Sequence, residues 1–162
     1  MTGLPTDALR VGETLPPLVL PPLTRATLAL YAGGSGDHIP LHIDSDFAKA
    51  AGHRDVFMHG MLGVAYLVRM ITHWVPQERL RDIHVRFSAI TYPGEQLTAA
   101  GVVSAIAPDG AVALALLDLA RQHGPQLRDL GADRRQPLLL ARVVAGVRRQ
   151  CDQLTVDHRD RR

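Results

Sequence analysis

The most apolar part of the chain runs from about residue 60 to residue 75. Polar side chains are few there, and a helix that is apolar nearly all round is a buried one. At 1.5 Å per residue such a helix is about 24 Å long, and Pro76 cannot continue it. The apolar positions that predict this buried helix are Met61, Leu62, Val64, Ala65, Leu67, Val68, Met70, Ile71, Trp74 and Val75.

The period of the pattern changes after this helix. Residues 83–90 alternate apolar and polar positions, which predicts a half-buried strand. A Tyr-Pro-Gly-Glu turn follows, and residues 96–107 and 111–120 predict two more strands. The Pro-Asp-Gly sequence between these two is a strong hairpin signal. A buried helix followed by an antiparallel meander indicates an α+β fold in which the sheet wraps one helix.

Shorter elements precede the long helix. Residues 11–23 contain four prolines, which donate no backbone hydrogen bond, so they predict at best an irregular edge strand. Thr24 is suited to cap a helix that ends in the glycine-rich run at residues 33–36. A second short helix is expected at residues 46–51, with Ser45 or Asp44 as its cap.

The chain length fits one domain with a core. It has 162 residues, of which 46% are hydrophobic and 21% charged, which is too short for two comfortable domains. We expect a loose arm at residues 1–9, one domain at residues 10–147 and a basic polar tail at residues 148–162. Within the domain, residues 137–147 fit a last strand or a short helix, and periodicity alone does not decide between them.

Composition narrows the function classes. Cys151 is the one cysteine, which excludes an internal disulfide framework and a cysteine-built zinc site and suits a reducing, cytoplasmic setting. The first ten residues carry no basic start followed by an apolar run, so no secretory signal is expected. Polar residues interrupt the longest apolar stretch, at residues 58–75, so no membrane span is expected.

The charge is unevenly distributed along the chain. The net charge is +2, and residues 121–162 hold ten arginines and five aspartates. Such a tail can bind an anionic partner, but it has no aromatic residue on which a base could stack. We therefore expect a solvated tail and no nucleic-acid partner.

Candidate chemistry gathers in residues 31–44, which read Tyr-Ala-Gly-Gly-Ser-Gly-Asp-His-Ile-Pro-Leu-His-Ile-Asp. Pro40 stiffens the chain between Asp37 and His42. An acid and an imidazole five residues apart in a rigid turn can converge on one water as a general acid/base pair. The same pattern also fits an aspartate that caps the next turn and a histidine on the surface, so both interpretations stay open here.

Three segments together resemble one family. Residues 31–44 resemble the signature of the MaoC-like, (R)-specific enoyl-thioester hydratases, in which a Ser-Gly-Asp sequence is followed by Asn-Pro, an aliphatic residue and His. Residues 55–62, with their His-Gly-Met, resemble the family's second landmark, where the central helix begins. Residues 83–87 and the turn at residues 92–95 resemble the third. The match covers about residues 10–120.

The resemblance implies a hot-dog fold, a long buried helix wrapped by an antiparallel sheet and usually paired into dimers. It implies that Asp37 and His42 activate a water that adds to a trans-2-enoyl thioester of coenzyme A or acyl carrier protein, or that they run the reverse dehydration of a (3R)-3-hydroxyacyl thioester. No cofactor is implied. The backbone N–H of Gly60 would bind the thioester oxygen, because the first N–H groups of a helix are unpaired and carry the positive end of its dipole. The expected substrate contacts are Tyr31, Ser35, Gly36, Ile39, Pro40, His59 and Met61.

Some features leave alternatives open. Ile39 stands where the family pattern has Asn, and the tail after residue 130 departs from the family's final strand. Both favour a second hypothesis, a non-catalytic acyl-thioester-binding or regulatory module. A thioesterase is a third, although it uses another carboxylate arrangement. The helix at residues 60–75 resembles that of the catalytic subunit of heterodimeric (3R)-hydroxyacyl-ACP dehydratases, so a second subunit is an alternative to a homodimer. No metal is expected, since the histidine pairs His38/His42 and His53/His59 lack a third matched ligand.

Overall fold

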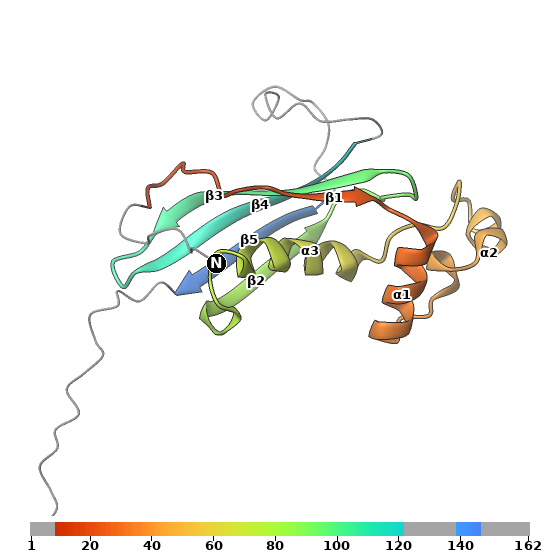
Figure 1. Ribbon diagram of the computed structural model, residues 1–162, viewed down its shortest axis with the longest axis horizontal. Helices are drawn as coiled ribbons and strands as arrows, with labels where there is room; N and C mark the ends of the chain where they lie inside the picture. Colours follow the sequence, from red (N-terminus) through yellow and green to blue (C-terminus); the bar gives the residue numbers. More distant parts are fainter. Residues whose placement is uncertain (1–8, 122–138, 147–162) are drawn as a thin grey trace, which may run out of the picture.

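A five-stranded antiparallel sheet lies against helix α3 in the computed structural model, which describes residues 9–121 and 139–146 (Figure 1). The strand order is β1-β3-β4-β5-β2. The predicted α+β arrangement of one long helix on an antiparallel sheet is confirmed. The elements are β1 (Leu18–Pro22), α1 (Arg25–Ser35), η2 (Pro40–His42), α2 (Ser45–Ala50), α3 (Gly60–Thr72), η3 (Gln77–Arg79), β2 (Leu80–Phe87), β3 (Gln96–Ile106), β4 (Ala111–Arg121) and β5 (Leu139–Gly146).

Helix α3 is shorter than predicted and has one exposed stripe. Its 13 residues span about 20 Å. The sheet covers one side of the helix only, so Met61, Ala65 and Arg69, spaced four residues apart, are exposed in the single chain. The expectation of a helix buried all round is therefore wrong for this stripe. The buried side forms the main core, whose members are Leu15, Val64, Leu67, Met70, Ile71, Trp74, Val75, Ala99, Val103, Val112, Leu114 and Leu116.

Strands β3 and β4 form the floor on which α3 packs. Alternate residues of β3 are buried, as the period of two requires. Gly101 leaves room for side chains packed between the sheet and the helix: a Cβ there would be 2.7 Å from Cδ2 of Leu116 and 3.1 Å from Cε of Met70. The hairpin between β3 and β4 forms where predicted, with Gly110 at φ 80°.

Strand β2 departs from the prediction in place and in burial. It covers residues 80–87 rather than 83–90, and it pairs with β5 at the edge of the sheet rather than with β3. The meander therefore consists of β3, β4 and β5, and β2 lies outside it. Most side chains of β2 are exposed, including Ile83 and Phe87, because α3 packs on the central strands β3 and β4.

The remaining sequence expectations have mixed outcomes. Residues 137–147 contain a strand, β5, rather than a helix. The proline-rich segment forms β1, an edge strand with a register shift, as expected. Helix α1 continues through the glycine-rich run and ends only at Gly36 (φ 76°). Asp44, not Ser45, caps α2 by accepting from two main-chain N–H groups. The residues 1–8 of the expected arm and the tail at 148–162 lie outside the described residues.

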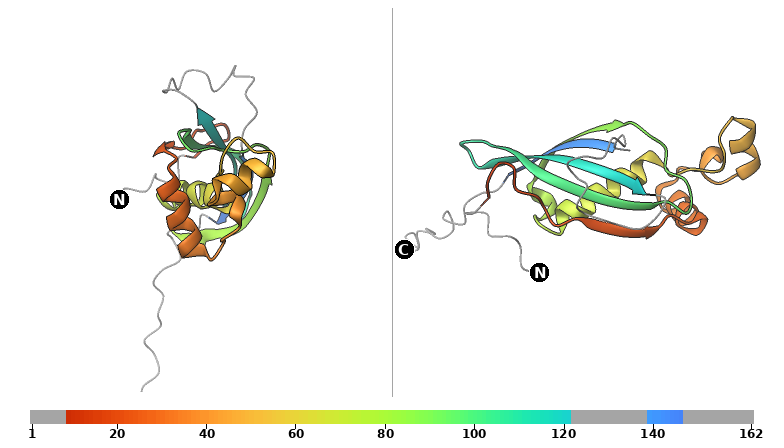
Figure 2. Two further views of the ribbon diagram at one scale, coloured as in Figure 1. Left: turned by 90° about the vertical axis from the view of Figure 1, so that its right-hand side faces the viewer. Right: turned by 90° about the horizontal axis from the view of Figure 1, so that it is seen from above.

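Helices α1 and α2 gather at the end of the sheet where α3 begins (Figure 2). They rest on a second, smaller core formed by Leu23, Leu28, Ala48, Val56 and Leu62. This core joins α1, α2 and the start of α3, and the η2 turn lies between α1 and α2. The candidate residues of these elements therefore meet at one end of the molecule. None of the helices in residues 9–121 is long and apolar enough to span a membrane.

Candidate active site

The turn between α1 and α2 carries Asp37 and His42. Its first bend is fixed by Ser35, whose hydroxyl donates to the carbonyl of Tyr31 over 2.7 Å and accepts from the N–H of Asp37 over 3.2 Å. The N–H of Ile39 then donates to Oδ1 of Asp37 over 3.4 Å. This local contact uses one carboxylate oxygen of Asp37, but it does not cap the η2 turn, whose N-cap is Ile39 and which has no side-chain cap.

His42 ends the η2 turn and faces inward. Its side chain is buried, which contradicts the alternative of a surface histidine. Nδ1–H donates to the main-chain carbonyl of Phe57 over 2.8 Å, and the Phe57 ring meets the imidazole edge-on at 4.9 Å between centroids. A carbonyl only accepts, so the proton of the neutral ring is on Nδ1 and Nε2 carries the lone pair.

Asp37, His42 and His59 form one cluster. Each offers a carboxylate oxygen or ring nitrogen, and these three atoms lie within 4.8 Å of one another. Two groups that hydrogen-bond the same water at about 2.8 Å and at a tetrahedral angle are separated by about 4.6 Å. The predicted convergence of Asp37 and His42 on one water is therefore compatible with the geometry.

His59 lies beneath this pair and is fully buried. Its ring is 4.0 Å from that of His42 between centroids and 4.9 Å from that of Tyr31. Nε2–H donates to the main-chain carbonyl of Asp37 over 3.1 Å. Burial is the main cause that lowers the pKa of His59 from its ordinary 6.5, and the neighbouring His42 adds to it, while Asp37 opposes it.

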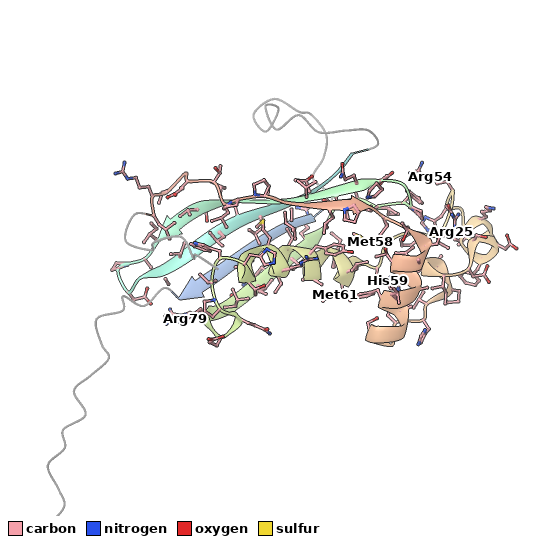
Figure 3. All side chains as sticks on the ribbon, viewed as in Figure 1. Arg25, Arg54, Met58, His59, Met61 and Arg79 are labelled. Carbon is pink, nitrogen blue, oxygen red and sulfur yellow. The ribbon has the colours of Figure 1, made fainter. Side chains whose placement is uncertain are left out.

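Gly60 is the first residue of α3 and follows His59 directly. The N–H of Leu62 already donates to the carbonyl of His59, which leaves Gly60 and Met61 as the first donors of the helix. Phe87 of β2 packs against Gly60 so closely that a Cβ there would be 2.9 Å from Cε1 of the ring. Figure 3 places His59 and Met61 at the end of α3 beside α1.

The other predicted substrate contacts divide into two groups. Ser35 and Gly36 have structural tasks, since Ser35 fixes the bend and Gly36 caps α1 by donating to the carbonyl of Ala32. Pro40 begins the η2 turn. Ile39 and Met61 have exposed fractions of 51% and 57%, so their apolar side chains are accessible at the site.

The sequence analysis did not identify the residues that position the candidate catalytic side chains without belonging to the cluster. Phe57 supplies the carbonyl that orients His42. Arg54 stacks 4.1 Å above the ring of Tyr92 and pairs with Glu95, which also accepts the N–H of Tyr92. This clamp ties the segment before α3 to the turn after β2. Contacts between residues 41 positions apart, such as Arg54 and Glu95, leave no local pattern in the sequence. The sequence signal for this clamp was only that Arg54 and Phe57 lie just before the His-Gly-Met landmark.

The cluster also has the donor set of a metal site. Two imidazoles and one carboxylate suit a divalent transition metal. Each imidazole also donates one ring N–H to a main-chain carbonyl, as metal-ligating histidines do with the nitrogen that does not bind the metal. The sequence argument that no third ligand matches is therefore wrong, because His59 supplies one. The expectation that no metal binds stays a prediction, which addition of Zn²⁺ to the protein would test.

Comparisons with known proteins agree with this picture. A stretch of 93 residues matches the peroxisomal multifunctional enzyme type 2 of Mus musculus at 34% identity, covering 56% of this chain and 13% of that protein. The peroxisomal enoyl-CoA hydratase 2 of Arabidopsis thaliana matches at 31%, covering 56% of this chain and 30% of that protein. The chain thus spans less than a third of either relative.

Solved structures and family models complete the comparison. A chain of the ChsH1-ChsH2 complex from Mycobacterium tuberculosis superposes with a TM-score of 0.71 at 22% identity, covering 86% of this chain and 98% of that one. The likeness shows that the fold is the hot-dog fold. The model of the MaoC like domain matches residues 10–111. Because that match covers more than half of the 162 residues, the chain belongs to the MaoC-like domain family.

Proposed function

We propose that this domain is a hydro-lyase that interconverts trans-2-enoyl and (3R)-3-hydroxyacyl thioesters. The observation that carries the proposal is the convergence of Asp37 and the buried His42 within 4.8 Å beside the start of α3. A relative named enoyl-CoA hydratase 2 supports the reaction class. The (R) configuration rests on the resemblance of residues 31–44 to (R)-specific hydratases.

The proposed chemistry assigns one role to each polar group. His42 takes a proton from the shared water at Nε2 as the water oxygen bonds to C3 of the substrate. The electron pair of the double bond moves onto the thioester oxygen as an enolate, and the proton then passes from Nε2 to C2. Asp37 holds the second hydrogen of the water and so aims its oxygen. Water and proton add from the same side, which is a syn addition.

The start of α3 would stabilise the enolate. The N–H of Gly60 has no acceptor within the helix and lies at the positive end of the helix dipole. Preorganised donors at such an oxyanion contribute about 3–4 kcal/mol to the transition state. The exposed apolar side chains of Ile39 and Met61 are available to contact the acyl thioester.

Partners follow from the same resemblance. The substrate is an acyl thioester of coenzyme A or of acyl carrier protein. A homodimer is proposed, because β2 leaves an edge with apolar side chains exposed, and exposed edges favour pairing. A heterodimer with a second hot-dog subunit is the alternative, which the similarity to a chain of the ChsH1-ChsH2 complex supports.

The test is loss of the enoyl-thioester absorbance with crotonyl-CoA. The wild type is expected to hydrate the substrate, and His42→Ala and Asp37→Asn are each expected to lose at least about a hundredfold in rate. Binding of crotonyl-CoA without turnover by the wild type would instead assign a non-catalytic acyl-thioester module. Release of free thiol would indicate a thioesterase.

A further inference from the structure

His59 contacts three parts of the proposed active site at once. Its Nε2–H donates to the main-chain carbonyl of Asp37 over 3.1 Å. Its ring lies against the ring of His42, 4.0 Å away between centroids and inclined by 31°. It is also the residue before Gly60, at the N-cap of α3. One side chain therefore joins the turn, the imidazole and the helix start.

The hydrogen bonds define the proton positions on both rings. A carbonyl accepts and cannot donate, so neutral His42 carries its proton on Nδ1 and neutral His59 carries its proton on Nε2. The remaining nitrogen of His59, Nδ1, is buried and has no hydrogen-bond partner among the residues that the structure describes. A second proton on His59 would place a buried N–H without an acceptor there, which is unfavourable.

The surroundings of His59 also disfavour its charge. The titratable groups that face it are Tyr31 from α1 and Asp37 and His42 from the turn. Burial and, after it, His42 lower its pKa from the ordinary 6.5, and the main-chain carbonyl and the carboxylate of Asp37 oppose them only in part.

We propose that His59 is a positioning residue that holds the turn of Asp37 and supports the ring of His42. Its catalytic consequence rests on the proposed function, whereas its tautomer and contacts do not. The role differs from the substrate contact that the sequence suggested, since a fully buried side chain behind the pair does not touch substrate.

Two substitutions separate the hydrogen bond from the stacked ring. His59→Gln keeps a side-chain N–H near the position of Nε2, and His59→Phe keeps the ring without the donor. We expect His59→Phe to lower kcat about tenfold, the effect of one lost hydrogen bond to the main-chain carbonyl of Asp37, and His59→Gln to lower it less. KM should stay unchanged in both. A raised KM with unchanged kcat would overturn the proposal in favour of a substrate contact.

A spectroscopic test needs no activity. Two-bond ¹H–¹⁵N correlation spectra of histidine-labelled protein report the tautomer of each ring, and the His42 and His59 variants assign two of the eight histidines. We expect Nδ1–H for His42 and Nε2–H for His59. These tautomers without hydration would refute the proposed function alone, and other tautomers would refute the positioning role. Stoichiometric binding of added Zn²⁺ by both rings at micromolar concentration would also overturn it, by assigning a metal site.

Discussion

Substitution of Gly60 by alanine tests whether the start of α3 must lie where it does. The added Cβ would be 2.9 Å from Cε1 and 3.2 Å from Cδ1 and Cζ of Phe87, which is closer than ordinary carbon contacts. Either the ring or the first turn of the helix has to move. The N–H of Gly60, the proposed donor to the thioester oxygen, moves with the helix.

The loss of stability and of rate depends on whether the Phe87 ring or the first turn of α3 moves. Overpacking in a closed core costs about 1–3 kcal/mol, but Phe87 is 55% exposed and can shift toward solvent. Alanine also gains up to about 0.5–1 kcal/mol over glycine in a helix. The free energy of unfolding should therefore change by less than about 1 kcal/mol. A donor lost completely costs about 10²–10³ in rate, so a partial displacement should lower kcat/KM by about 10–100-fold.

The assay is crotonyl-CoA hydration with two matched variants. Gly34→Ala in α1 is the control, because a Cβ there meets nothing within 4 Å, and it should keep full activity. Gly60→Ala combined with Phe87→Ala removes the obstructing ring and should recover most of the lost rate. Full activity of Gly60→Ala alone would refute the reasoning, and so would a loss that the double variant does not repair.

Four further outcomes are expected. Gly101→Ala should lower stability by about 1–3 kcal/mol and the melting temperature with it, because the new Cβ meets Leu116 and Met70 between sheet and helix; an unchanged melting temperature would contradict this close approach. Ile39→Asn should raise the hydration rate a few-fold to tenfold, since position 39 is 51% exposed and an added amide can hydrogen-bond the turn without being buried; a slower, less stable variant would refute this. The lowered pKa of His59 means that the unfolded chain binds the proton first, so stability should fall as pH drops below 6.5, by at most about 1.4 kcal/mol per pH unit, and urea unfolding of His59→Gln should lack this component. Light scattering should report a dimer, and a stable species of 17.6 kDa at micromolar concentration would exclude it.

The hydrophobic pattern predicted the elements better than their pairing. The helix from Gly60 and the hairpin of β3 and β4 follow from local periods of 3.6 and 2 and from turn residues. The position of β2 does not, because its partner β5 comes about 60 residues later and is inserted between β4 and β2. Alternation in β2 predicted half burial, but only the neighbouring layers determine whether a strand is covered.

Only the part of the site that lies within residues 31–44 could be predicted from the sequence. Asp37 and His42 lie five residues apart, and the stiff turn between them is visible in the sequence. Their convergence with His59 depends on how α1, α2 and α3 pack on the small second core, which no local pattern encodes. For the same reason the sequence presents His59 only as part of the His-Gly-Met landmark. In the structure it contacts both the main chain of Asp37 and the ring of His42.

Non-additivity of the Asp37→Asn and His42→Ala substitutions tests the central claim most directly. If both side chains act on one water, each single variant removes that step, and the double variant should be no more than a few-fold slower than the slower single variant. The measurement is kcat/KM for crotonyl-CoA hydration by the wild type, both single variants and the double variant, with unfolding curves as the control for folding. A double-variant loss equal to the product of two losses of about a hundredfold would show independent roles, and near-normal activity of either single variant would contradict the mechanism altogether.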